Sequence, residues 1–561
     1  MRAAGYVKAL LPSWGDYRSV RRTWRGDAIA GITVGIVALP LALAFGVSSG
    51  AGAESGLVTA IVAGVIAAVF GGSNIQVSGP TGAMVVVLGP IVAAHGPGMV
   101  AVVSLMAGAI VLIAGALKLG RVVSFIPWPV IEGFTLGIAV IIFLQQVPAA
   151  VGSKPGPSSN ALVSAIQSFH QVNWSAVVFP LAVVAVVAVI MGLAPKIHRA
   201  VPGSIIAIIV VAIIASVANL PLARIGTLPN HLPAPGLPIA SAATMTSLVG
   251  AAFTVAALAA IESLLSARVA ASISDTGPYD ADRELVGQGL ASIASGFFGG
   301  MPATGAIART AVNIRSGGKP RVSAIIHAVV LLAVVYLATG VVSQIPLAAL
   351  SGVLMVTATR MISLSTVRAV LRSTRSDAVV FIVTAIITVS VDLIVAVGIG
   401  IAVAAFFALR TLAKSGGVHR EEIPGQAQPE DEQIALFRLD GALFFGAADR
   451  MSDRVTRIRN ASVVIIRLSQ LQVLDATGAR VITEMVHALE RRGITVLLKG
   501  IQPQHLSLAT RVGVLDALRH ENHLFDSLDA AVDHARSHVA RIANPAIITA
   551  MTDHPTSKGT T

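Results

Sequence analysis

Residues 70–84 read FGGSNIQVSGPTGAM, and residues 298–310 read FGGMPATGAIART. Both stretches place a TGA triplet shortly after an FGG triplet, and the two TGA triplets lie 223 residues apart. A second pattern, Ile-Pro with a glycine six residues after the proline, occurs at 126–133 and again at 345–352, which is 219 residues later. The shared order and the nearly equal spacing predict an internal repeat, an architecture found in many membrane transporters.

The composition is that of a membrane protein. Hydrophobic residues make up 55% of the 561-residue chain and charged residues only 12%, about half the charged fraction of a soluble domain. One membrane helix needs about 20 apolar residues, and on that basis we expect fourteen spans. These are residues 29–47, 54–70, 80–94, 99–117, 122–146, 175–194, 203–219, 246–268, 284–299, 304–315, 321–341, 346–362, 377–391 and 393–411, with a break placed at Asp392.

The distribution of basic residues supports this count. With the N-terminus in the cytoplasm, 21 Lys and Arg residues fall on the cytoplasmic side, and only Lys154 and Arg224 fall on the outer side. This asymmetry follows the positive-inside rule. We therefore expect a multi-pass protein of the inner (plasma) membrane, with both termini in the cytoplasm and no cleaved signal peptide. Seven spans per repeat is an odd number, so the two repeats have opposite orientations in the lipid bilayer.

The chain changes character after the hydrophobic body. A polar stretch is followed by short apolar runs that alternate with amphipathic helical patterns, which is typical of a small α/β domain. The expected organisation is a cytoplasmic segment at 1–26, a transmembrane domain at 27–412 with repeats at about 27–195 and 246–412, a linker at 413–432, the α/β domain at 433–541 and a disordered tail at 542–561.

Several function classes are excluded by what the sequence lacks. The chain has no cysteine, so it has no disulfide, no catalytic thiol and no Cys-ligated metal. It contains no phosphate-binding GxxxxGK[ST] loop, no HExxH and no GxSxG. We expect no enzyme activity, no cofactor and no bound metal. The basic excess lies in the hydrophobic part of the chain, so nucleic-acid binding is not expected. A secondary transporter or a channel remains.

The two TGA stretches are candidates for an anion pocket. Pro80 suits the first turn of a helix, and Gly79 lets a ligand approach the backbone. The unpaired N–H groups and the positive dipole end of a short helix attract anions, and the second stretch repeats the design from the opposite direction. Alternatively, the small residues serve only tight helix packing. The candidate substrate-binding residues are Phe45, Gly79, Pro80, Thr81, Gly82, Ala83, Gly305, Ala306, Ile307, Ala308 and Arg309.

Glu262 is the candidate for ion coupling. It lies within an apolar span, where a carboxylate is costly and faces a cavity or a partner. Apolar surroundings favour the protonated form, which suits proton coupling. Ser266 lies one turn further on the same face. The alternative is a structural carboxylate bonded to a neighbouring serine or to the backbone. Arg309 has three alternative roles. It could supply positive potential to the pocket, form an ion pair with Glu262, or simply lie at the cytoplasmic end of a helix.

These features together resemble the sulfate permease (SulP) family of anion transporters. The resemblance covers residues 24–541 and includes DAIAGITVGIVALPLALAFG at 27–46, IESLLSAR at 261–268 and the two FGG stretches. The part around LDATGARV (474–481) resembles a STAS domain. The resemblance implies fourteen spans in two inverted seven-helix repeats, arranged as a core and a gate domain, and a homodimer. It places the substrate between the third and tenth helices, on Gly79–Ala83 and Gly305–Ala308, beside Phe45 and Arg309.

Departures from the family pattern bear on coupling and regulation. Sodium-dependent bicarbonate carriers of the family have an aspartate in place of Glu262 and a threonine in place of Ile307. Losing an oxygen ligand weakens a sodium site, so the sequence favours H⁺ over Na⁺. The phosphorylated residue of anti-sigma antagonist STAS proteins falls on Thr477, which is otherwise an ordinary threonine at a helix start.

The resulting functional hypothesis is an H⁺-coupled symporter of a small anion that works by an elevator-like movement. Sulfate, bicarbonate and C4-dicarboxylates are the candidate substrates. One alternative is an uncoupled anion channel or exchanger. A second is a nucleobase permease, which shares the seven-plus-seven architecture. A third is a membrane-tethered signalling protein that binds a cytoplasmic partner through its STAS domain.

Overall fold

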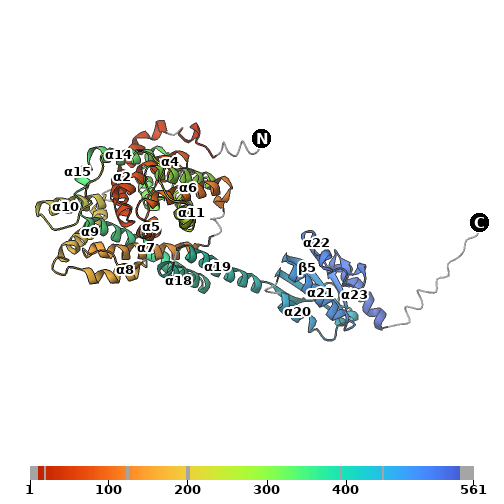
Figure 1. Cartoon of the computed structure of the whole chain (residues 1–561). Helices are drawn as coiled ribbons and strands as arrows, with labels where there is room; N and C mark the ends of the chain where they lie inside the picture. The colour runs from red at the N-terminus through yellow and green to blue at the C-terminus, as the bar shows by residue number, and fades with distance from the viewer. Residues whose placement is uncertain are drawn as a thin grey trace, which may run out of the picture. The chain divides into compact units, whose positions relative to one another are not determined.

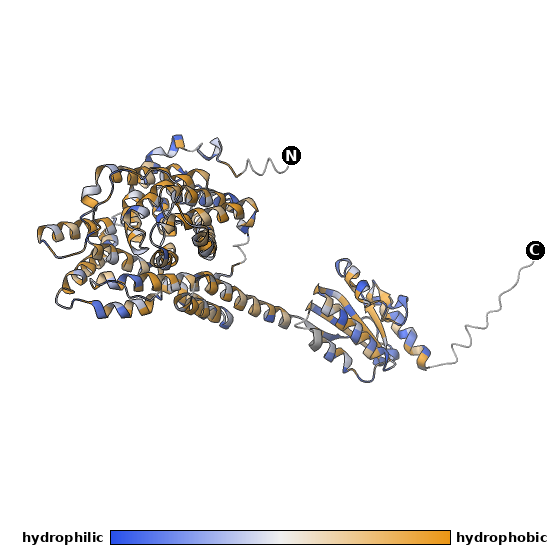
Figure 2. Cartoon of the chain, viewed as in Figure 1, coloured by the Kyte–Doolittle hydropathy of each residue, from blue (hydrophilic) through white to orange (hydrophobic). Residues whose placement is uncertain are grey.

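The computed structural model describes residues 10–17, 20–121, 126–158, 160–197, 202–391, 393–444 and 448–543. The chain divides at residue 404 into two compact units, here called the membrane unit and the C-terminal unit. Figure 2 shows that apolar residues cover most of the helices of the membrane unit. Among the described residues, eight helices are long and apolar enough to cross a membrane, judged by length and composition.

Each of the fourteen expected spans overlaps a helix (Figure 1), and the last of these helices, α19 (Leu393–Ser415), continues past residue 404, where the two units are divided. The helices are α2 (Val20–Ser48), α3 (Ala53–Val58) continued by η2 (Thr59–Ala63) and α4 (Gly64–Phe70), α5 (Gly82–His95), α6 (Met99–Ala116), α7 (Trp128–Ala150), α9 (Val178–Ile197), α10 (Gly203–Val217), α11 (Ala242–Ile273), α12 (Ala281–Phe297), α13 (Ile307–Arg315), α14 (Val322–Leu337), α16 (Leu347–Met361), α18 (Arg375–Ser390) and α19. Shorter elements are η1 (Trp14–Tyr17), α8 (Ala161–Ser168), η4 (Phe169–Gln171), α15 (Thr339–Val342) and α17 (Leu364–Ser373).

One boundary differs from the sequence prediction and another agrees with it. The first span begins at Val20 rather than at residue 29, because the helix continues through three arginines before it becomes apolar. The expected break in the last apolar stretch is present, since α18 ends at Ser390 and α19 begins at Leu393. Asp392 itself lies outside the described residues.

The spans pack in two groups that each draw helices from both halves of the chain. In the first group, α2 packs against α14, and α12 packs against α4 and α6, while α11 contacts α6 and α13. In the second group, α7 packs against α16 and α18, and α9 packs against α10 and α16. Such exchange of helices between two halves fits inverted repeats that form a core and a gate. The helical membrane fold expected from the sequence is therefore confirmed.

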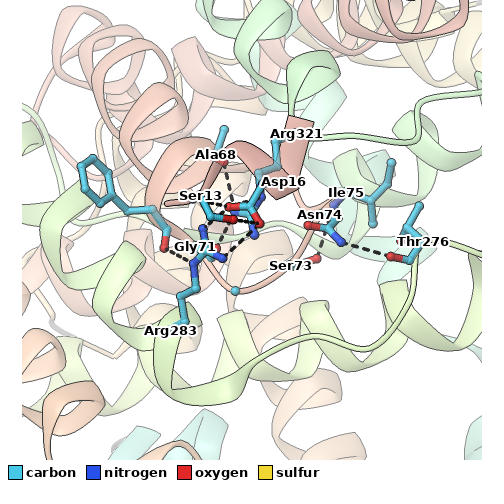
Figure 3. Close-up of polar contacts among 12 residues, drawn as sticks. Ser13, Asp16, Ala68, Gly71, Ser73, Asn74, Ile75, Thr276, Arg283 and Arg321 are labelled. Carbon is cyan, nitrogen blue, oxygen red and sulfur yellow. Dashed lines mark hydrogen bonds and ion pairs between the residues drawn. The ribbon is translucent and has the colours of Figure 1, made fainter. Parts of the chain in front are cut away.

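An acidic residue before the first span ties helix ends of the first group together (Figure 3). Arg283 at the start of α12 donates from Nη2 to Asp16 Oδ2 at 2.6 Å and from Nε to the Phe70 carbonyl at 3.4 Å. Arg321, just before α14, lies 3.9 Å from the same carboxylate and donates to the Gly71 carbonyl. The two arginines thus cap the C-terminal end of α4, where unpaired carbonyls carry partial negative charge, and Asp16 offsets part of their positive charge.

Asp16→Asn is expected to lower the stability of the purified full chain by about 2 kcal/mol. Burial alone would raise the pKa of Asp16, but hydrogen bonds from Arg283 and Ser13 and the charge of Arg321 outweigh it and hold the pKa at about 2. This stabilisation is complete above pH 3.8 and is lost as the pH falls through about 2. The measurement is the thermal unfolding midpoint at pH 7.

Asp453→Asn, which removes an exposed i,i+4 pair with Arg457, is the control, and it should change the midpoint little. Equal midpoints for wild type and Asp16→Asn would contradict the assignment.

The C-terminal unit is a five-stranded sheet covered by helices. Its strand order is β3-β4-β5-β6-β7, with β3 antiparallel to β4 and the remaining neighbours parallel. Central strands of parallel sheets are buried on both faces, which explains the apolar run that opens β5. The elements are β3 (Gly417–Glu421), η5 (Pro429–Gln433), β4 (Ile434–Leu443), α20 (Ala448–Thr456), β5 (Val463–Leu474), α21 (Ala476–Glu490), β6 (Thr495–Lys499), α22 (Pro503–Val512), η6 (Glu521–His523), β7 (Leu524–Phe525) and α23 (Leu528–Ala543).

The start of this unit differs from the sequence interpretation. Residues 413–432 were expected to be a linker, but Gly417–Glu421 within them forms the edge strand β3. At the other end, α23 extends to Ala543. The expected disordered tail lies outside the described residues from 544 onwards.

Histidines gather where α23 packs on η6 and β7. The ring of His523 lies 5.5 Å from those of His520 and His534 and 6.4 Å from that of His538, measured between ring centres. Buried nitrogens of His523, His534 and His538 have no hydrogen-bond partner in the described part of the chain. No group of three or more ligating side chains there is placed to hold a metal ion. Burial, and to a lesser extent the charges of the neighbouring histidines and Arg519, together lower the pKa of His523 to about 4.

Acidification is therefore expected to loosen α23. A histidine whose pKa is lowered on folding contributes stability above pH 6.5, and this is lost as the pH falls towards its folded value. For His523, with a pKa of about 4, the folded packing should weaken about 30-fold at pH 5 relative to pH 8. Hydrogen exchange of α23 in the full chain, corrected for intrinsic rates, measures this, with α21 as the internal control. His523→Phe keeps a ring without the proton and should flatten the response; identical α23 protection at both pH values would refute the idea.

Candidate functional site

The two TGA stretches meet in the membrane unit through a short strand pair. Strand β1 (Ser78–Gly79) runs antiparallel to β2 (Thr304–Gly305), with Ser78 opposite Gly305 and Gly79 opposite Thr304. Each strand leads directly into a short helix, β1 into α5 and β2 into α13. Because the strands are antiparallel, the two helices leave neighbouring points in opposite directions. Their N-terminal ends therefore lie close to one another, one from each half of the chain.

Both helix starts keep their first-turn N–H groups available. The N-cap residues are Thr81 for α5 and Ala306 for α13, and neither side chain caps its helix. The first N–H groups of a helix have no acceptor within the helix, and they carry the positive end of its dipole. Two such ends side by side form a site for a compact anion that needs no lysine.

Glycines let neighbouring groups approach these helix starts. A side chain at Gly82 would collide with Ile142 of α7 and would lie 3.4 Å from a ring carbon of Phe45. Phe45 thus lies beside the start of α5, as the sequence analysis expected. At Gly79, where φ is +155°, a Cβ would lie 2.6 Å from Nη1 of Arg309. Tight packing, the alternative interpretation, therefore also applies.

Arg309 links the two helix starts. Its side chain is 2% exposed, and Nη2 donates a hydrogen bond of 2.5 Å to the carbonyl of Pro80. Its Nη1 has no hydrogen-bond partner among the described residues. Arg309 is the third residue of α13 and so does not mark a helix end. Within the described residues it also forms no ion pair with Glu262, since no such pair lies within 4.0 Å. A buried guanidinium without an ion-pair partner makes this site electropositive.

Helix α11 brings Glu262 to the start of α5. Oε2 of Glu262 accepts a hydrogen bond of 2.8 Å from the Thr81 hydroxyl. The next residue, Ser263, is bonded to the other stretch, because its hydroxyl lies 2.9 Å from Thr304 Oγ1 and accepts from Gly305 N at 3.0 Å. The bond from Glu262 to a neighbouring serine that the sequence offered as an alternative is replaced by a bond to Thr81, which lies 181 positions away in the chain. The Ser266 hydroxyl is buried and has no partner in the described part of the chain.

The remaining predicted residues fall into three places. Ala83 lies in the buried first turn of α5, and Ala308 follows Ile307 in the first turn of α13. Ile307 is 41% exposed although Ala306 and Arg309 beside it are buried, so open space adjoins the start of α13. Thr477 is exposed in the first turn of α21, where Asp475 caps the helix by accepting from Gly478 N at 2.7 Å.

A buried carboxylate beneath the site escaped the sequence analysis. Glu284 accepts hydrogen bonds from the backbone N–H groups of Gly72 and Ser73 and from the side-chain amides of Gln76 and Gln288, at 2.8 to 3.0 Å. These bonds fix the loop that leads into β1. The available signal was an acid and an amide four residues apart at the start of an apolar helix, which places both on one face.

A cavity of about 920 Å³ lies between α11 and α7, and the candidate site residues are not among those that line it. Ile261 and Leu264 line it from α11, on either side of Glu262 in sequence, and Ile131 lines it from α7. Charged residues from three segments also line it: Lys118, Arg121, Arg268, Asp280 and Asp282. The cavity therefore separates a helix of the first group from a helix of the second.

Comparison with known proteins places this site in a family. The model of the sulfate permease family matches residues 24–384, and the STAS domain model matches residues 427–531. The Bacillus subtilis protein YvdB is 34% identical over 519 residues, which cover 90% of this chain and 96% of YvdB. The solved transmembrane domain of a cyanobacterial bicarbonate transporter, BicA, is 34% identical with a TM-score of 0.60, and covers 67% of this chain and 97% of that one.

The solved structure of the murine anion transporter Slc26a9 in its inward-facing state has a TM-score of 0.82. The match covers 95% of both chains, and its TM-score shows a shared fold although the sequence identity is only 18%. The resemblance drawn from the sequence motifs is thereby confirmed. The chain belongs to the sulfate permease family and carries a STAS domain after its membrane unit.

Proposed function

We propose that this chain is a secondary active transporter of a small anion, coupled to protons. The observation that carries the proposal is the meeting of two uncapped helix N-termini, one from each half of the chain, beside the buried guanidinium of Arg309. Three positive features converge there, and the carboxylate of Glu262 is hydrogen-bonded to Thr81 at the start of one of the two helices. Membership of the sulfate permease family and the likeness to BicA, a bicarbonate transporter, support anion transport. Sulfate, bicarbonate and C4-dicarboxylates are the proposed substrates.

Coupling follows from repulsion between the anion and Glu262. An anion at the start of α5 is close to Thr81, whose hydroxyl is bonded to Glu262. A negative Glu262 repels that anion and a protonated one does not. Because such coupling is reciprocal, the bound anion also favours the protonated form, and anion and proton bind together. Sodium needs several oxygen ligands, and Ile307 offers none beside the site, so we propose H⁺ rather than Na⁺ as the coupling ion, with no metal or organic cofactor.

The two helix groups provide the moving parts. We propose that the first group carries the site past the second in an elevator-like movement, with the cavity between α11 and α7 as the open access path. The basic residues Lys118, Arg121 and Arg268 around this cavity lie on the side that the positive-inside rule assigns to the cytoplasm. On that basis the chain faces inward, with both termini in the cytoplasm of a plasma-membrane protein. A homodimer and a cytoplasmic partner for the STAS domain, regulated through exposed Thr477, complete the proposal.

The test is uptake of radiolabelled sulfate, bicarbonate and fumarate into proteoliposomes, with and without an inward proton gradient. We expect one of these anions to accumulate above equilibrium only when the gradient is present. Uptake that ignores the gradient would overturn coupling and favour a channel or an exchanger. Deletion of residues 433–541 tests the signalling alternative. If the protein acts in signalling, the deletion should leave anion uptake intact and abolish binding of a partner protein.

A further inference from the structure

Helix α17 carries positive charges that the protein itself leaves uncompensated. Arg368 and Arg372 on α17 and Arg375 at the start of α18 are exposed, and none of them forms an ion pair or hydrogen bond within the described residues. Arg368 and Arg372 are four residues apart, where like charges repel across one helix turn. Arg375 lies at the positive end of α18, which also disfavours a cation. The nearby Asp377 accepts instead from the Ser373 hydroxyl at 3.3 Å.

Apolar side chains accompany these arginines on the same side of α17. Leu364 is 64% exposed and Leu371 is 43% exposed, whereas Val370 is fully buried. At 3.6 residues per turn, Leu364, Leu371, Arg368 and Arg372 fall within an arc of about 100°. Val370 lies outside that arc, and α17 packs against α18 and α7. The helix thus has one side against the protein and an exposed side of two leucines and two arginines, here called the α17 strip.

The other half of the chain contains a neutral counterpart. Helix α8 follows α7 as α17 follows α16, and the Ile-Pro repeat pairs α7 with α16. Leu162, Val163 and Ile166 of α8 are exposed, but α8 has no basic residue. Inverted repeats place these two helices at opposite faces of the membrane. Exposed apolar residues therefore occur on both helices, at both faces of the membrane, whereas the arginines occur only on α17, at one face.

We propose that the α17 strip, together with Arg375, binds anionic phospholipid headgroups at the membrane surface. A basic amphipathic helix between two spans lies in the interface with its apolar residues among the acyl chains. Long arginine side chains reach from there to the phosphates. An anionic lipid offers a negative headgroup that pairs with the arginines and acyl chains that surround Leu364 and Leu371. A free anion in water offers only the negative charge. Each cation contributes about fivefold in affinity for an anionic surface.

Lipid titration of the purified full chain tests this. The delipidated protein in neutral detergent is titrated with phosphatidylglycerol, phosphatidylcholine or inorganic phosphate, and the thermal unfolding midpoint is followed. For wild type we expect stabilisation by phosphatidylglycerol and not by the other two. The variant Arg368→Gln/Arg372→Gln/Arg375→Gln should need about 100-fold more phosphatidylglycerol, as three fivefold losses imply. The matched Lys variant at the same three positions keeps the charge and should stay within a few-fold of wild type.

Two results would overturn the proposal: an unchanged phosphatidylglycerol titration for the Gln variant, or equal stabilisation of wild type by inorganic phosphate. If the triple Gln variant does not fold, Arg372→Gln alone decides, with a fivefold loss expected and no loss contradicting the assignment. The readout is lipid binding, so the outcome does not depend on which anion is transported or on whether protons drive it.

Discussion

Glu262→Gln is expected to abolish proton-driven accumulation of the anion while leaving its downhill movement in place. Glutamine has the same shape and its side-chain oxygen can still accept the hydrogen bond that Glu262 takes from Thr81, but it cannot exchange a proton. A gradient of two pH units concentrates an anion up to about 100-fold when one proton accompanies each anion at zero membrane potential. The Gln variant should bring the internal and external concentrations to equality, with or without the gradient.

Two variants control this result. Glu262→Asp keeps a proton-binding group and should retain part of the accumulation. Glu132→Gln removes a carboxylate of α7 that accepts from the Trp128 indole at 3.0 Å and lies outside the proposed site, so it should accumulate like wild type. Accumulation by Glu262→Gln at the wild-type ratio would show that the proton travels by another route.

Arg309→Met is expected to lower anion uptake by about 10- to 100-fold. A hydrogen bond to a charged group contributes about 1.5–3 kcal/mol, and Arg309 is the buried cation next to both helix starts. The loss should be greater for a dianion such as sulfate than for a monovalent anion, because the attraction scales with the charge of the ligand. Initial uptake rates over a range of concentrations, without a proton gradient, measure both effects.

Arg309→Lys and Arg315→Met complete this series. The Lys variant keeps the charge but loses the geometry of the bond to Pro80, and it should fall between wild type and Arg309→Met. Arg315 is exposed in the last turn of the same helix, and its replacement should leave uptake unchanged. Equal uptake losses for monovalent and divalent anions would indicate that Arg309 serves only to hold α5 and α13 in place.

The sequence predicts most of the fold because hydrophobic length and charge asymmetry are local signals. The start of α2 was missed because Arg21, Arg22 and Arg25 interrupt its hydropathy, although the helix continues through them. Strand β3 was missed because an edge strand needs no apolar run when one side is open to water. Both errors concern polar segments that a neighbouring element orders.

The candidate site was predicted in its parts but not in its connections. The TGA stretches and Phe45 could be assigned from the repeat and the resemblance, whereas the bond between Glu262 and Thr81 joins residues 181 positions apart. Similarly, the fully buried Asp27 accepts a local hydrogen bond from the Thr23 hydroxyl at 2.6 Å, but it also accepts one from the backbone N–H of the distant Lys319 at 2.9 Å. Periodicity shows which face of a helix is apolar and does not show which distant residue packs against it.

The most direct test of the central claim is an experimental structure of the full chain with the anion that the uptake assay selects. We expect density for the anion between the starts of α5 and α13, within about 3 Å of first-turn N–H groups of both helices, with the Arg309 guanidinium behind it. A transported anion bound elsewhere in the membrane unit, with the two helix starts in contact and no ligand between them, would contradict it.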